Sequence, residues 1–165
     1  KPAREPLSNH YFVESLTRLT GLVHDTSDFE TDKDGWFNPD PTVLNNFERD
    51  SGGTTSLNTG PSAGAGGSTW YMYAQAAYPN SNSVFGMQKT FPAGQELYGI
   101  SFWYHKYGVD IDTSYLETSA DGTSGSWTLL WSKTGDQGNS WQQATVYALG
   151  SDQTSLRFTC VPLLL

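Results

Sequence analysis

The sequence predicts an all-β fold, a jelly-roll-like antiparallel β-sandwich with a short N-terminal helical or linker segment. Of its 165 residues 16% are charged, 14% are aromatic and 17 are glycine. This composition suits antiparallel sheets and is poor for long helices. From residue 28 onward apolar side chains recur with a period of two, and turn-forming residues separate short segments. Because no helical pattern interrupts these segments, a sandwich is favoured over alternating strands and helices.

The N-terminal segment 1–27 follows a different pattern. Phe12, Leu16 and Leu19 recur at helical spacing, and Gly21 follows them as a stop signal. One amphipathic helix of about three turns is the simplest interpretation. A linker, or the tail of a preceding domain, is an equally good one. We therefore divide the chain into this segment and a β-sandwich domain over residues 28–165.

Six segments of the domain are expected to be strands. They are residues 70–77, 97–105, 113–118, 127–133, 141–149 and 154–161. In the second of these, Tyr98, Ile100, Phe102 and Tyr104 alternate with smaller or more polar residues. This set is expected to face the core.

The charge and cysteine content exclude several classes of function. A net charge of -8 argues against nucleic-acid and anionic-membrane partners, since both require a basic surface. With Cys160 alone, no intrachain disulfide and no cysteine-based zinc site can form. The longest apolar run, Val161–Leu165, is interrupted by Pro162 and is too short to insert across a membrane.

Acidic residues gather where a first strand of the domain is expected. Glu30, Asp32 and Asp34 lie close together in sequence, beside Asp28. Calcium binds carboxylate and carbonyl oxygens, so a structural Ca²⁺ or another hard cation is one interpretation. The other is that these residues only form turns, and the spacing leaves both open.

Two sets of residues are candidates for ligand binding. Trp127 and Trp131 are an even number of positions apart, so a regular strand would point both to one face, where they could stack on sugar rings. They could equally fill the core. His105 and Asp110 form a second candidate set, at the rim of the sandwich.

The acids within residues 110–117 raise the alternative of a glycoside hydrolase. It would need two carboxylates about 5–10 Å apart, for which Asp110, Asp112 and Glu117 are the candidates. The first two lie beside Gly108, where a solvated loop is the better interpretation. Since no nucleophile motif is present either, the chain is not expected to be an enzyme.

Six stretches carry a family pattern in order along the chain. They are Phe29-Glu30, Gly35-Trp36, Phe47–Thr54, Thr59–Ser62, Ile100–Gly108 and Gly135–Gly138 with the following Trp141. Together with the segment 70–77 they resemble the MAM domain, the extracellular module named after meprin, the A5 antigen and receptor tyrosine phosphatase mu. The resemblance covers about residues 28–159.

The resemblance implies a non-catalytic adhesion or protein-interaction module. Its location would be extracellular or at the cell surface, as one domain of a larger protein. Its partner would be a protein, in homophilic or heterophilic contact. The alternative is a carbohydrate-binding module of a secreted multidomain enzyme, with glycans as ligands.

The chain departs from the family pattern in two ways. The paired cysteines usual in animal members are absent, so it resembles a cysteine-poor variant. The family's acidic closing strand is not recognisable after Phe158, so the C-terminus looks truncated and a sheet edge is expected to be exposed. Several members bind a cation with acids of the first and closing strands. Only Glu30 carries over, with Asp32 and Asp34 added by proximity, so no cofactor is certain.

Overall fold

The computed structural model describes residues 25–162 except 55, 57, 76–83, 93–96, 109–110, 124–125 and 148–151. Almost all of the N-terminal segment 1–27 lies outside these residues. The choice between helix and linker there therefore stays a prediction.

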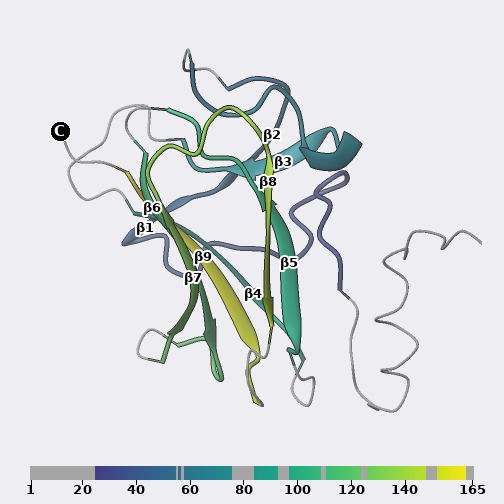
Figure 1. Ribbon diagram of the computed structural model, residues 1–165. Coiled ribbons are helices and arrows are strands. Elements are labelled where there is room, and N and C mark those ends of the chain that lie inside the picture. The colour runs from purple at the N-terminus through teal and green to yellow at the C-terminus, as the bar shows by residue number, and fades with distance from the viewer. Residues whose placement is uncertain are drawn as a thin grey trace, which may run out of the picture.

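The described residues form a β-sandwich of short strands (Figure 1). One layer is a five-stranded sheet in the order β1 (Leu44–Asn46), β4 (Val84–Thr90), β9 (Ser155–Pro162), β6 (Ile111–Ser119) and β7 (Thr128–Thr134). The remaining strands form two antiparallel pairs, β2 (Glu48–Ser51) with β3 (Trp70–Tyr73) and β5 (Gly99–Tyr104) with β8 (Gln142–Tyr147). A 3₁₀ turn, Ala65–Gly67, precedes β3. The prediction of an all-β sandwich is confirmed.

The C-terminal strand β9 lies in the middle of the five-stranded sheet. It pairs with β4 on one side, where Cys160 faces Phe85, and with β6 on the other, where Phe158 faces Leu116. Both pairings are antiparallel. Strands therefore flank β9 on both sides, and the edges of this sheet are β1 and β7. The expectation that a closing strand missing after Phe158 leaves an edge exposed stays a prediction.

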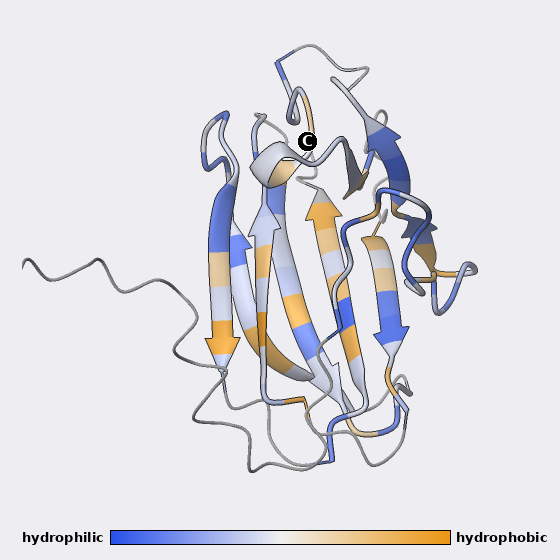
Figure 2. Ribbon diagram, turned by 90° about the vertical axis from the view of Figure 1, so that its right-hand side faces the viewer, coloured by the Kyte–Doolittle hydropathy of each residue, from blue (hydrophilic) through white to orange (hydrophobic). Residues whose placement is uncertain are grey.

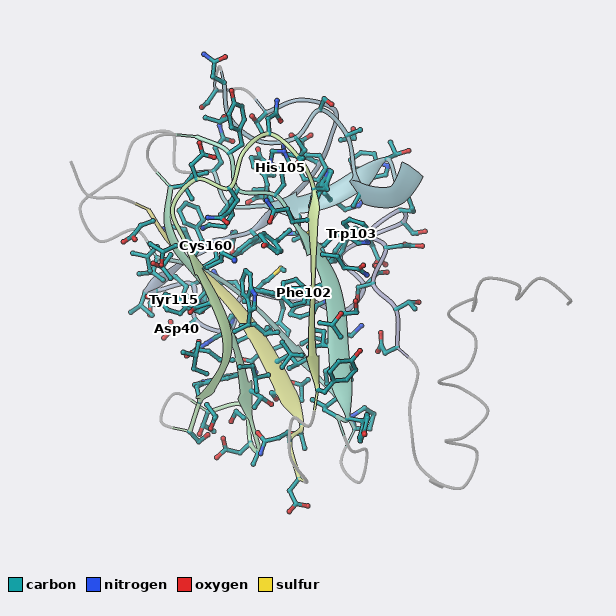
Figure 3. All side chains as sticks on the ribbon, viewed as in Figure 1. Asp40, Phe102, Trp103, His105, Tyr115 and Cys160 are labelled. Carbon is teal, nitrogen blue, oxygen red and sulfur yellow. The ribbon has the colours of Figure 1, made fainter. Side chains whose placement is uncertain are left out.

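Aromatic side chains join the β5–β8 pair to the five-stranded sheet. The ring of Phe102 on β5 lies 5.1 Å from Trp131 on β7 and 5.0 Å from Phe158 on β9, between centroids. Figure 3 shows Phe102 pointing into the space between the layers. Leu116 and Leu156 are fully or almost fully buried in this core.

Strand β5 largely follows the alternation expected of it. Ile100, Phe102 and Tyr104 are partly buried, whereas the side chains between them are exposed. The colouring of Figure 2 shows such alternation of apolar and polar residues along the strands. Tyr98 is the exception: it precedes β5, is exposed, and does not belong to the core face.

Candidate interaction surface

Glu30 anchors the segment before β1 to the start of β3. Its Oε1 accepts hydrogen bonds from the Ser68 hydroxyl at 2.6 Å and from the backbone N–H groups of Thr69 and Trp70 at 2.7 and 3.1 Å. These bonds, that of Ser68 foremost, lower the pKa of Glu30 because they favour the charged carboxylate. The carboxylate thus satisfies donors at the start of a strand.

The other two predicted metal ligands belong to a turn. Asp32 accepts a hydrogen bond from the N–H of Asp34 at 2.6 Å, and Asp34 accepts one from the N–H of Phe29 at 2.7 Å. Phe29 and Asp34 have positive φ values of 60° and 49°, so this segment is not the first strand expected from the sequence.

The cation site at Glu30, Asp32 and Asp34 stays a prediction. Within the part of the chain that the structure describes, no three His, Cys, Asp or Glu side chains are grouped to hold a metal ion. Glu30, Asp32 and Asp34 instead accept hydrogen bonds from nearby backbone donors. The arrangement is that of turn and strand-end capping groups.

His105 lies partly buried at the end of β5. Its Nε2 is 3.2 Å from Asn139 Oδ1, and its ring meets Trp141 edge-on at 5.5 Å between centroids. Burial is the main influence on His105 and lowers its pKa; Asn139 and Asp136 act in the opposite direction. The second member of the predicted rim pair, Asp110, lies outside the described residues, so that pair stays a prediction.

A β-bulge in β7 changes which face its tryptophan occupies. Leu116 pairs with Trp131, but the next residue, Glu117, pairs with Leu129, so Leu130 has no partner in this register. One extra residue reverses the alternation of all side chains beyond it. Two residues on either side of the bulge that are an even number of positions apart therefore point to opposite faces of the sheet.

Trp127 and Trp131 accordingly do not form one sugar-stacking face, and that prediction is wrong. Trp131 packs inside the sandwich, 5.0 Å from Tyr104 and 5.1 Å from Phe102 between ring centroids. Trp127 lies under the guanidinium of Arg157, 4.2 Å from the ring centroid. The core interpretation holds for Trp131.

The described acids of β6 also fail to form a catalytic pair. Glu117 Oε2 accepts two hydrogen bonds from Arg157, at 2.8 and 3.0 Å. Asp112 Oδ1 accepts one from Thr113 at 3.0 Å. Five positions along a strand separate Asp112 from Glu117 by roughly 15 Å, beyond the range of a glycosidase pair.

Two exposed aromatic side chains lie on the outer side of the β5–β8 pair, and sequence reasoning did not single them out. Trp103 is 49% exposed and Tyr147 is 66% exposed. Figure 3 shows Trp103 pointing away from the layer interface that Phe102 enters. Ser101, Gln143 and Thr145 share this side. We call these five residues the β5–β8 face. The alternation along 97–105 was the available signal, because it places Trp103 on the side of the strand that faces away from the core.

A second exposed apolar surface lies beside β1. Val43 is 64% exposed, and Phe37 is also exposed. The Nδ2 of Asn38 donates to Leu44 O at 2.9 Å and to Asn46 Oδ1 at 2.8 Å, which ties the segment of Phe37 to β1. Phe37 pairs with Gln88 and Leu44 with Val84, so Phe37 and Val43 lie at the two ends of this edge. A shallow hollow adjoins this area, lined by Asn45, Asn46, Glu48, Gln75 and Phe85. We call Phe37, Asn38, Val43, Asn45 and Asn46 the β1 surface.

Across the described residues, no helix has the length and apolar character needed to cross a bilayer. The features of the described surface are instead patches of exposed apolar side chains on a β-sandwich. Fold and surface together define a sandwich domain of the jelly-roll type. The family model of the MAM domain, meprin/A5/mu, matches residues 27–161, and the chain therefore belongs to the MAM domain family.

Several curated proteins are similar to this chain. Neuropilin-1a of Danio rerio is 34% identical over 123 residues, which are 68% of this chain and 13% of that protein. The MAM domain-containing glycosylphosphatidylinositol anchor protein 1 of Mus musculus is 29% identical over 144 residues, 82% of this chain and 15% of the relative. Thyroid hormone-induced protein B of Xenopus laevis is 28% identical over 123 residues, 70% of this chain and 17% of the relative. The chain thus spans under a fifth of the length of each.

Proposed function

We propose that this chain is a non-catalytic recognition module that binds a protein partner outside the cell or at its surface, as one domain of a larger protein. Membership of the MAM family over residues 27–161 supports this proposal. One similar protein, from Mus musculus, carries a glycosylphosphatidylinositol anchor in its name. A module of this kind works by surface complementarity, with apolar anchors surrounded by polar groups.

The observation that carries the proposal is the β1 surface. Val43 and Phe37 offer exposed apolar area, and the amides of Asn45 and Asn46 lie beside the adjoining hollow. Apolar anchors next to a polar rim are what a protein interface needs. The strand beneath, β1, is a short edge strand held by β4 alone within the described sheet.

A catalytic role has no comparable support among the described residues. Glu117 is held by Arg157. Glu30 is held by Ser68 and by the backbone of β3. Carboxylates committed to such contacts are poorly placed to transfer protons to a substrate.

Coated beads test the proposal for both kinds of protein partner. Beads carrying the domain are observed alone and with cultured cells, and the cells are used either intact or after trypsin treatment. Clustering of the beads would identify a second copy as the partner. Attachment to intact cells that trypsin abolishes would identify a different protein. Beads that neither cluster nor attach, or attachment that trypsin leaves unchanged, would contradict the proposal.

A further inference from the structure

The strands β5 and β8 form a surface without charge on a strongly acidic chain. Neither Gly99–Tyr104 nor Gln142–Tyr147 contains an Asp, Glu, Lys or Arg, although the chain carries a net charge of -8. Charged side chains at a contact favour charged ligands and penalise neutral ones that leave them unpaired. A face of this kind suits a neutral ligand.

Polar side chains at the centre of the β5–β8 face are already ordered. The Nε2 of Gln143 donates to Ser101 Oγ at 3.0 Å, and the hydroxyls of Ser101 and Thr145 are 3.1 Å apart. An amide has two N–H donors and one carbonyl acceptor, and the contact with Ser101 uses one donor. Because the row is held in place before binding, little side-chain entropy remains to be lost.

Two aromatic rings flank this row. Trp103 lies opposite Gln143, and Tyr147 lies opposite Gly99, so the two aromatic residues are four positions apart along the strands, or roughly 13 Å. The Tyr147 ring leans over Gly99: its Cδ1 is 3.4 Å from the position that a Cβ there would take. Despite this contact Tyr147 remains two-thirds exposed.

We propose that the β5–β8 face binds a neutral, extended oligosaccharide or polysaccharide. Sugar rings combine apolar C–H faces, which pack on Trp103 and Tyr147, with hydroxyls, which pair with Gln143, Ser101 and Thr145. The separation of the two aromatic residues along the strands calls for a chain of sugars rather than a single one. This inference does not depend on the proposed protein contact, which uses the β1 surface.

Affinity electrophoresis tests the proposal directly. The acidic domain migrates through native gels cast with a neutral polysaccharide: hydroxyethyl cellulose, arabinoxylan, galactomannan or mixed-linkage β-glucan. We expect at least one to retard the wild-type domain, with no loss of retardation when salt is raised. Trp103→Ala and Tyr147→Ala should each weaken binding about tenfold or more, the usual cost of removing an aromatic anchor. Gln143→Ala, which keeps both rings, should weaken it less.

Trp127→Ala is the matched control, because it removes a tryptophan that lies on another strand under Arg157. It should bind like the wild type. The proposal is overturned if none of the four polysaccharides retards the wild type, if Trp103→Ala is retarded equally, or if Trp127→Ala loses binding as strongly. Attachment of beads to cells that requires Trp103, with no retardation in any gel, would assign this face to a protein and also overturn it.

Discussion

Phe102 and Trp131 meet edge to face across the interior of the sandwich, with centroids 5.1 Å apart and ring planes at 89°. This is a favoured geometry for aromatic pairs. One ring comes from the β5–β8 pair and the other from an edge strand of the five-stranded sheet. The contact therefore helps to join the two layers without a disulfide.

Replacing Phe102 by Ala is expected to lower the free energy of unfolding by about 3 kcal/mol, because it removes a large ring from between the layers. The control is Trp103→Ala, which removes a larger ring from the outer side of the same strand and should cost under about 1 kcal/mol. Urea unfolding followed by circular dichroism measures both. Equal losses would contradict the assignment of inner and outer sides.

Glu117→Gln is expected to destabilise the domain by about 1 to 3 kcal/mol, since it leaves the partly buried Arg157 without its carboxylate. Glu48→Gln makes the same chemical change in an exposed pair with Lys33, whose N···O distance is 4.0 Å. That change should cost under about 0.5 kcal/mol. Chemical denaturation measures the loss of unfolding free energy in each variant. A larger loss in Glu48→Gln than in Glu117→Gln would contradict the stabilising role of the Glu117–Arg157 pair.

The partial burial of His105 predicts a dependence of stability on pH. Its pKa in the folded domain is lowered by burial, so protonation favours the unfolded chain. The contribution is complete above the unfolded pKa of about 6.5 and is lost as the pH falls from there through the lowered folded value. Wild type should therefore lose more stability between pH 7 and pH 5 than His105→Gln does. If denaturation curves show that both proteins lose the same stability between pH 7 and pH 5, His105 is not the source of the pH dependence.

Glu30 is predicted to act through hydrogen bonds and not through a metal. A chelator should leave the melting temperature unchanged, and added calcium should not raise it. Glu30→Gln should lower the melting temperature at pH 7, because the amide is a weaker acceptor for Ser68, Thr69 and Trp70 than the carboxylate. The lowered pKa of Glu30 means that this difference disappears as the pH falls through the folded pKa. A melting temperature that rises with calcium in the wild type but not in Glu30→Gln would support the cation site.

The sequence predicted the fold class, the family and the core side of β5 because all three depend on repeated patterns. Alternation over Ile100, Phe102 and Tyr104 is a signal that one strand carries by itself. Strand β4 was not predicted, because four consecutive residues of it, Phe85–Gln88, are buried and hide any alternation. At Gly86 a Cβ would lie 2.7 Å from Leu44 Cδ1, so a larger residue there would displace the Leu44 side chain.

The candidate site was less predictable because it depends on register. The single unpaired Leu130 separates the faces of Trp127 and Trp131, and spacing in the sequence cannot reveal such a bulge. The β5–β8 face needs the pairing of two strands that lie about forty residues apart, as in the contact of Ser101 with Thr145. Neither strand alone indicates that their polar residues form one row.

The central claim, that this MAM domain binds a protein through the β1 surface, is tested most directly by one matched pair of variants in the bead assay. Val43→Lys places a charge on the β1 surface, whereas Leu129→Lys changes an aliphatic side chain of similar exposure, 56% against 64%, on the opposite edge strand β7. We predict that Val43→Lys abolishes bead clustering or trypsin-sensitive attachment and that Leu129→Lys preserves it. Retention of binding by Val43→Lys, or equal loss in both variants, would contradict the account.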